Sequence, residues 1–224
     1  MKPWKTIDVE DTDDGQLELL YRGDQDFLIT IDGSVLMSSA FHKSEMALST
    51  WGCGPVCNRP SPRVLTAGLG LGFTLRAALD ILPSDAQVVV AEINPVVVKW
   101  CRGPAAMLSD DALADERVEL VVGDVMECVR DVSRGVRAAF DAIVVDLYVG
   151  PGRDPEGHQD AFYGSDALLA VKSALTEGGV YAVWGEEQEP EFDESLQRAG
   201  FLTSCARPRG PGPPHVIYVA VKPS

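Results

Sequence analysis

The stretch VLTAGLGLG at residues 64–72 decides the fold class, because it joins an apolar run to three glycines at alternate positions. The run Val64–Ala67 has the composition of a strand that is buried on both faces. The glycines let the chain turn tightly and let a ligand approach the backbone, and the helix predicted over Phe73–Leu82 then offers free N–H groups. Phe73 stands where a dinucleotide-binding fingerprint has its third glycine, so the motif alone is a weak signal.

Strands and helices alternate after this stretch. Runs that are apolar on both faces, separated by helices, predict a parallel sheet with helices on each side. The expected strands are Val88–Ala91, Val118–Val122, Phe140–Val145 and Val180–Trp184. The expected helices begin at Asn94-Pro95 or extend over Val125–Val132, over Ala161–Leu175 with a stop at Gly178-Gly179, and over Phe192–Ala199.

The last two predicted strands, Phe201–Cys205 and Val216–Val221, are joined without a helix by the Pro/Gly-rich segment Arg207–Pro214. They should therefore pair as an antiparallel hairpin at the edge of the sheet. This ending is typical of the class I methyltransferase sheet and is not expected of a six-stranded parallel dinucleotide fold. The sequence thus predicts an α/β fold with a Rossmann-like class I methyltransferase sheet, parallel except at its end.

The first fifty residues have a different pattern. Three short strands and a helix are predicted, over Leu17–Tyr21, Phe27–Ile31, Ser34–Met37 and Ser44–Trp51. The helix would carry Met46, Ala47 and Trp51 on one side. We therefore expect residues 1–50 to form a small β lid or oligomerisation segment, and residues 51–224 to form the catalytic domain.

Composition and charge limit the function. Apolar residues make up 46% of the 224 and charged residues 24%, which is ordinary for a globular protein with a large core. Nineteen basic against 34 acidic residues give a net charge of −15, which argues against a nucleic-acid partner. The charge suits a cationic substrate, although it also simply keeps a protein soluble. No apolar run is long enough for a membrane span, and no secretory signal is visible.

Metal chemistry is not expected. The cysteines are five in number, and only Cys53 and Cys57 lie close together, with poor spacing for zinc. The three histidines, His42, His158 and His215, are spread along the chain. Reduced thiols and the absence of a signal predict a cytoplasmic protein without a metal site.

Polar residues follow the predicted strands at their carboxyl ends, where open α/β sheets bind ligands. Glu92 ends the second strand and could accept hydrogen bonds from both hydroxyls of a ribose. Ile93 could lie against an adenine face or fill the core, and Asp124 could cap the next helix, contact the adenine amine, or do both. Asp146 follows six apolar residues and is a candidate general base, with a structural acid as the alternative.

The same edge supplies candidates for an acceptor site. Tyr148 and Tyr163 could line an acceptor pocket, Tyr148 next to the chemistry, or could pack within loops. Trp184 and Glu186 follow the fifth strand and could wall that pocket. His158 could contribute to the acceptor chemistry or lie exposed in its loop.

Together these strand ends resemble the class I S-adenosylmethionine-dependent transferases, and among them the spermidine-synthase-like (polyamine aminopropyltransferase-like) branch. The resemblance covers about residues 33–184. It is carried by Phe41…Glu45-Met46, Val64–Gly72, Val88–Asn94, Gly123-Asp124, Phe140–Asp146 in the pattern FDxIxxD, and the segment from Phe162-Tyr163 to Gly179.

The resemblance implies an S-adenosylmethionine site, a homodimer and a small-molecule acceptor. The glycine loop would wrap the methionine portion, Glu92 the ribose and Asp124 the adenine amine, while Asp146 would hold the position of the base that deprotonates the attacking amine. The implied cofactor set is Gly68, Leu69, Gly70, Gly72, Glu92, Ile93, Asp124, Val125 and Asp146.

Two departures from the family pattern favour methyl transfer from intact S-adenosylmethionine. Aminopropyltransferases have aspartates where this chain has Leu71 and Val149. Each missing carboxylate removes a charge-assisted bond of about 1.5–3 kcal/mol to an amine. We therefore expect a methyltransferase that acts on a small acceptor, an amine in the favoured case, with Asp146 as base.

Three alternatives remain open. The chain could be an aminopropyltransferase that uses decarboxylated S-adenosylmethionine, with Asp154, Glu186 or Glu187 in place of the missing acids. It could be a non-catalytic nucleoside-binding protein, because a fold does not fix a function. An NAD-dependent oxidoreductase is disfavoured by Phe73 and by the hairpin ending.

Overall fold

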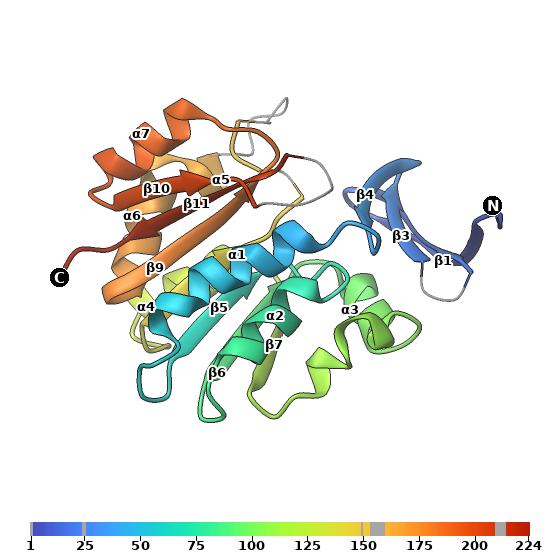
Figure 1. Cartoon of the computed structure of the whole chain (residues 1–224), viewed down its shortest axis with the longest axis horizontal. Coiled ribbons are helices and arrows are strands. Elements are labelled where there is room, and N and C mark those ends of the chain that lie inside the picture. Colours follow the sequence, from blue (N-terminus) through green and yellow to red (C-terminus); the bar gives the residue numbers. More distant parts are fainter. Residues whose placement is uncertain (1, 24–25, 149, 153–159, 209–213) are drawn as a thin grey trace.

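Two sheets organise the computed structural model, which describes residues 2–23, 26–148, 150–152, 160–208 and 214–224. Within these residues the larger sheet has seven strands in the order β10-β11-β9-β8-β5-β6-β7 (Figure 1). Its strands are β5 (Arg63–Ala67), β6 (Gln87–Glu92), β7 (Val118–Val122), β8 (Phe140–Val145), β9 (Leu175–Gly185), β10 (Leu202–Ala206) and β11 (Val216–Val221). The five strands from β9 to β7 in this order pair in parallel, while β11 is antiparallel to both β9 and β10. The predicted fold class and its terminal hairpin are confirmed.

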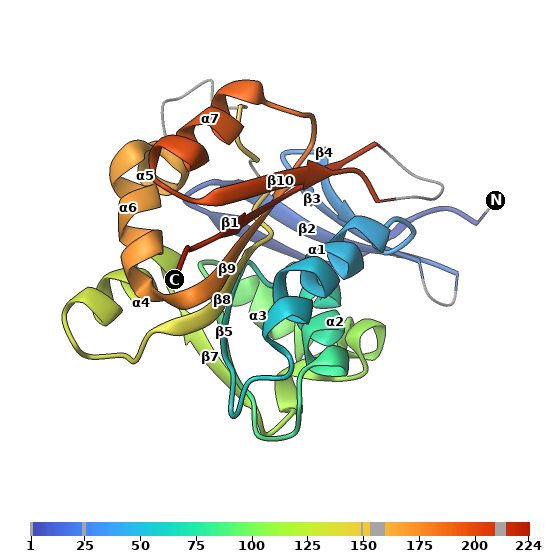
Figure 2. The ribbon, with the colours of Figure 1, turned by 60° about the vertical axis from the view of Figure 1, so that its left-hand side comes forward.

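Helices cover both faces of this sheet. They are α1 (Lys43–Cys53), α2 (Phe73–Ile81), α3 (Pro95–Cys101), α4 (Val125–Ser133), α5 (Asp160–Tyr163), α6 (Ser165–Ala174) and α7 (Pro190–Arg198). Figure 2 shows α1, α2 and α3 on one face and α4, α6 and α7 on the other. Successive residues of β5 belong to different cores, Val64 to that under α1–α3 and Leu65 to that under α4, α6 and α7. Both faces of the strand are therefore buried, which explains why Val64, Leu65 and Ala67 are all apolar.

A second sheet precedes the large one. It contains β1 (Lys5–Thr12), β2 (Gly15–Arg22), β3 (Asp26–Ile31) and β4 (Ser34–Ser38) in chain order, all antiparallel. The sequence predicted the last three and missed β1. That strand is acidic and lies at the edge with nearly every residue exposed or partly exposed, so it has no alternation of burial to detect.

The predicted helix over Ala161–Leu175 was wrong in its extent. Gly164 separates α5 from α6, and the chain is already in β9 at Leu175, ahead of the expected stop at Gly178-Gly179. Leu175 pairs with Phe140 of β8, and Gly178 donates to the carbonyl of Lys222. Sheet pairing therefore overrides the local helical pattern at this point.

The predicted side of α1, with Met46, Ala47 and Trp51, is only partly buried. Ala47 and Trp51 pack against the core with part of their surface exposed. Met46 is 44% exposed, whereas the buried side holds Ser44, Glu45, Leu48, Ser49, Gly52 and Cys53. A methyl group on Gly52 would lie 2.9 Å from side-chain atoms of both Val144 and Ala182. The small residues allow α1 to pack closely on β8 and β9, and this turn of the helix brings Glu45 inside.

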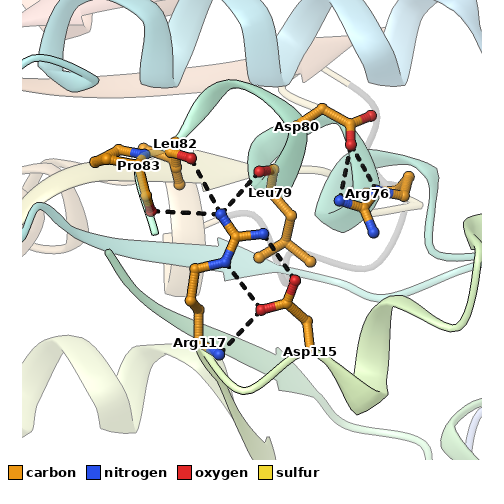
Figure 3. A network of polar contacts seen from close by, with 7 residues as sticks. All are labelled: Arg76, Leu79, Asp80, Leu82, Pro83, Asp115 and Arg117. Atoms are coloured by element: carbon orange, nitrogen blue, oxygen red, sulfur yellow. Dashed lines mark hydrogen bonds and ion pairs between the residues drawn. The ribbon is translucent and has the colours of Figure 1, made fainter. Parts of the chain in front are cut away.

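Arg117 closes the carboxyl end of α2 (Figure 3). It directly precedes β7, so it lies at the amino ends of the parallel strands, opposite to the glycine loop. Its Nη1 donates to the carbonyl oxygens of Leu79, Leu82 and Pro83 at 2.9, 3.0 and 3.4 Å. Its Nε and Nη2 donate to the two carboxylate oxygens of Asp115 at 2.9 and 2.7 Å. Arg117 thus satisfies helix-end carbonyls that would otherwise lack donors.

We expect Arg117→Met to lower the free energy of unfolding by about 2–3 kcal/mol, because several partly buried acceptors lose their donor together. Urea denaturation at pH 7 measures this loss. Arg76→Met is the matched control, because Arg76 forms an exposed pair with Asp80 one turn away, worth about 0.5 kcal/mol or less. Equal losses in the two variants would contradict the capping role.

Candidate functional site

The glycine loop between β5 and α2 keeps its backbone open through positive φ angles. Gly68, Gly70 and Gly72 have φ of 85°, 53° and 82°, a region that favours glycine. A Cβ on Gly68 would collide with the carbonyl oxygen of Asp146, so the loop and the end of β8 touch directly. Met37 of β4 lies over Gly70, and its Sδ accepts the N–H of Leu71 at 3.0 Å. The second sheet therefore covers this loop through the side chain of Met37.

Glu92, the last residue of β6, is buried with 7% of its surface exposed. Its Oε2 accepts the N–H of Leu69 at 2.9 Å, and its Oε1 accepts the N–H of Asn94 at 2.8 Å. Burial raises the pKa of this carboxyl, and these N–H donors oppose the rise. The N–H groups of Gly70 and Ile93 also act on this carboxylate and lower its pKa. A carboxylate offers about four acceptor positions, so the two hydroxyls of a bound ribose would share these positions with the backbone donors.

Two further predicted residues lie near Glu92: Ile93 directly follows it at the end of β6, and Asp124 follows the neighbouring strand β7. Ile93 is 59% exposed, so an apolar face is open beside the buried carboxylate. Asp124 is the N-cap of α4 and accepts the N–H of Met126 at 2.9 Å, which confirms its predicted capping role. Val125, which follows it, is buried. The roles of these residues toward a nucleoside stay predictions.

Asp146 follows β8, in the middle of the sheet, next to the glycine loop. Its N–H donates to the carbonyl of Ala67 at 2.9 Å, and its carboxylate accepts the hydroxyl of Thr74 on α2. Burial, with a contribution from the nearby charge of Glu45, raises the pKa of Asp146 to about 7. A carboxyl that titrates near neutrality can take a proton and release it again at physiological pH.

The predicted acceptor residues lie at different depths. Tyr163 is buried and packs edge-on against Phe192 at 5.5 Å, and burial raises its pKa well above the usual value. Tyr148 is 60% exposed, so the structure does not bring it into the buried part of the site. Trp184 lies at the end of β9, followed by Glu186. His158, Asp154 and Val149 lie outside the described residues.

The structure adds a group that the sequence did not assign to the site. Glu45 is 7% exposed, and its Oε2 accepts the hydroxyl of Ser44 at 2.6 Å. The Oγ of Ser44 also lies 3.0 Å from Nδ1 of His215, whose ring meets that of Trp184 edge-on at 4.6 Å. The sequence pointed to Glu45 only as part of the Phe41…Glu45-Met46 match, because the helical pattern singled out the side of Met46, Ala47 and Trp51 instead.

Within the described ranges, no group of three or more His, Cys, Asp or Glu side chains is arranged to hold a metal ion. The same ranges contain no helix with the length and hydropathy that a membrane crossing requires. The five cysteines are free thiols.

Comparison with known proteins places these features in a family. The model of the spermine/spermidine synthase domain matches residues 52–199. The chain is 31% identical over 133 residues to the polyamine aminopropyltransferase of Clostridium tetani and 32% identical over 126 residues to a spermine synthase of Saccharomyces cerevisiae. These matches cover 59% and 56% of this chain, but the chain spans only 44% and 40% of the two relatives.

Solved structures agree on the fold. Spermidine synthase from Thermotoga maritima matches 97% of this chain and 72% of its own, with a TM-score of 0.71 and 22% identity. A spermidine synthase in complex with the transition-state analogue AdoDATO matches the same shares, with a TM-score of 0.69 and 21% identity. The likeness extends beyond the matched domain to the small sheet, since nearly the whole chain is covered.

Proposed function

Because this chain belongs to the spermine/spermidine synthase domain family, we propose that it transfers an aminopropyl group from decarboxylated S-adenosylmethionine to a small cationic amine. The observation that carries the proposal is Asp146, a carboxyl at the end of the central strand, against the glycine loop, with its pKa raised to about 7. The names of the relatives favour the same reaction.

The residues on this edge divide the work between binding and proton transfer. The sulfonium donor supplies the activated carbon of its aminopropyl group. The rest of the donor leaves as a neutral thioether nucleoside. Glu92 would hold the ribose hydroxyls, and Ile93 would lie against the base. Asp146 would accept one proton from the amine, whose nitrogen lone pair then forms the new C–N bond while the C–S bond breaks. Alignment of the nitrogen with that carbon supplies most of the acceleration.

Methyl transfer, which Leu71 and Val149 favoured, is not supported by the comparisons, which agree with aminopropyl transfer instead. The structure also weakens the argument from Leu71. Its side chain is fully buried within the apolar core, and its N–H is bound to Met37. Leu71 therefore presents no surface that would discriminate the charged tails of the two donors.

A paired assay tests the proposal. The protein is incubated with 1,4-diaminobutane and either decarboxylated or intact S-adenosylmethionine, and the products are identified by mass. We expect an aminopropylated amine with the decarboxylated donor and no methylated amine with the intact one. The reverse result would overturn the proposal. Methylthioadenosine binding without turnover on either donor would support the non-catalytic alternative.

The small sheet would serve as a lid over the donor, as Met37 above Gly70 suggests. It is attached to the large domain by apolar packing, since Leu17, Leu19, Phe27 and Ile29 belong to the core under α1–α3. Polar contacts add to this, because the Asp8 carboxylate accepts from Nζ of Lys99 at 2.7 Å and from Nε1 of Trp100 at 2.8 Å. We propose that the strands β1–β4 within residues 1–50 form the lid and oligomerisation segment of a cytoplasmic homodimer, whereas α1, which begins at Lys43, packs on the large sheet. Sedimentation of the intact chain and of Val35→Glu, altered at a residue of β4 that is 59% exposed, tests the dimer.

A further inference from the structure

We propose that Glu45 is a positioning residue that acts through Asp146: its buried carboxylate, fixed by Ser44 and His215, holds Asp146 in the role of proton acceptor. The inference rests on the proposed function, because it assigns a partner to the base of that reaction. It concerns a residue on α1, far in the sequence from the strand ends that carry the rest of the site.

The first argument is the way in which Glu45 is held. Helix α1 packs on β8 and β9 through its small residues, so Glu45 points into the protein with only 7% of its surface exposed. The hydroxyl of Ser44 donates to it at 2.6 Å, and Nδ1 of His215 lies 3.0 Å from the same hydroxyl. This chain of two hydrogen bonds joins α1 to the start of β11. It leaves the Glu45 side chain little freedom to turn away.

The second argument is the charge around the two carboxyls. The charge of Glu45 raises the cost of ionising Asp146, and burial raises the pKa of both. Hydrogen bonds also connect the two elements: the hydroxyl of Ser49, one turn after Glu45 on α1, donates to the carbonyl of Thr74, whose own hydroxyl donates to Asp146. In the described part of the chain, no lysine or arginine is found to act on either group. The titratable groups that face the pair, or face its hydrogen-bond partners, are His42, Tyr163, Glu186 and His215.

The consequence for the reaction is that Asp146 is a stronger base with a fixed orientation. Thr74 binds one oxygen of Asp146 from α2, and the charge of Glu45 makes the same carboxyl hold a proton more tightly. An ammonium group that enters this region meets two carboxyls, and it can transfer a proton to Asp146. A base whose pKa lies nearer to that of the amine takes its proton more readily.

The test is Glu45→Gln, which keeps the shape and removes the charge. We expect the acid-side midpoint of kcat/KM against pH, near pH 7 in the wild type, to fall by about one unit. We expect kcat at pH 8 to fall about tenfold while the affinity for methylthioadenosine is unchanged. Glu45→Asp, which keeps the charge, should restore the midpoint, and Ser44→Ala should shift it in the same direction as Glu45→Gln by a smaller amount. Thr50→Ala, on the exposed side of α1, is the matched control.

A Glu45→Gln profile that overlays the wild type would overturn the inference, as would a loss of kcat that Glu45→Asp does not relieve. Should Glu45→Gln fail to fold, Glu45→Asp and Ser44→Ala carry the same test. Should the wild type transfer nothing to an amine, the proposed function fails separately. The midpoint of Asp146 is then followed by ¹³C-carboxyl NMR, assigned with Asp146→Asn, and it must still fall in Glu45→Gln.

Discussion

We expect Asp146→Asn to lower kcat by about 10²–10⁴-fold, the range that a positioned general base contributes. The amide keeps the shape of the side chain and can still bind the hydroxyl of Thr74, but it cannot accept the proton of an attacking ammonium. Binding of methylthioadenosine should stay within about threefold of the wild type. Steady-state kinetics with the decarboxylated donor and calorimetric titration of the nucleoside measure the two quantities.

The same substitution should stabilise the protein at alkaline pH. The folded pKa of Asp146, about 7, is above its usual value of 3.8. Its contribution to stability is therefore fully present below pH 4 and declines as the pH rises to about 7. Asparagine carries no charge to bury, so Asp146→Asn should gain about 2–4 kcal/mol over the wild type at pH 8. Urea denaturation at pH 4 and 8 measures the difference.

A substitution that lowers kcat but raises the free energy of unfolding identifies a buried catalytic carboxyl. A structural acid would lose stability at both pH values when it is replaced. An Asp146→Asn variant that is less stable than the wild type at pH 8 and still transfers the aminopropyl group would contradict the role of base.

The second large effect is expected at Glu92. In the proposed site Glu92 accepts both ribose hydroxyls, so Glu92→Ala would remove two hydrogen bonds to a carboxylate, each worth about 1.5–3 kcal/mol. Calorimetric titration should show methylthioadenosine binding weakened by about a hundredfold or more. Glu92→Gln, which keeps one acceptor oxygen, should fall between the wild type and Glu92→Ala.

Glu92 also accepts the N–H groups of Leu69 and Asn94. Disorder of the glycine loop would therefore also lower the affinity for the nucleoside, and it needs a separate control. Glu119→Gln, on the exposed part of neighbouring β7, should leave nucleoside affinity unchanged. Denaturation shows whether Glu92→Gln remains folded. Affinity within threefold of the wild type in Glu92→Ala would exclude the ribose role.

Most of the large sheet was predictable from the sequence, because its strands are apolar on both faces and end in glycine or acidic residues. β6 and β8, for example, end next to Glu92 and Asp146 as the pattern indicated. The small sheet was predicted only in part. β1 lies at its edge with little burial, and hydrophobic periodicity detects burial rather than backbone pairing.

The sequence alone determined the succession of strands in the large sheet, and with it which carboxylates lie at the carboxyl ends of the parallel strands, where such sheets bind ligands. Only the tertiary structure decided that Glu45 is buried near enough for its charge to act on Asp146, that Met37 covers the glycine loop, and that Leu71 points into the core. These contacts join residues of different elements. The face that a short helix or loop presents follows from close packing against its neighbours, as Gly52 against Val144 and Ala182 shows, and not from its own residues.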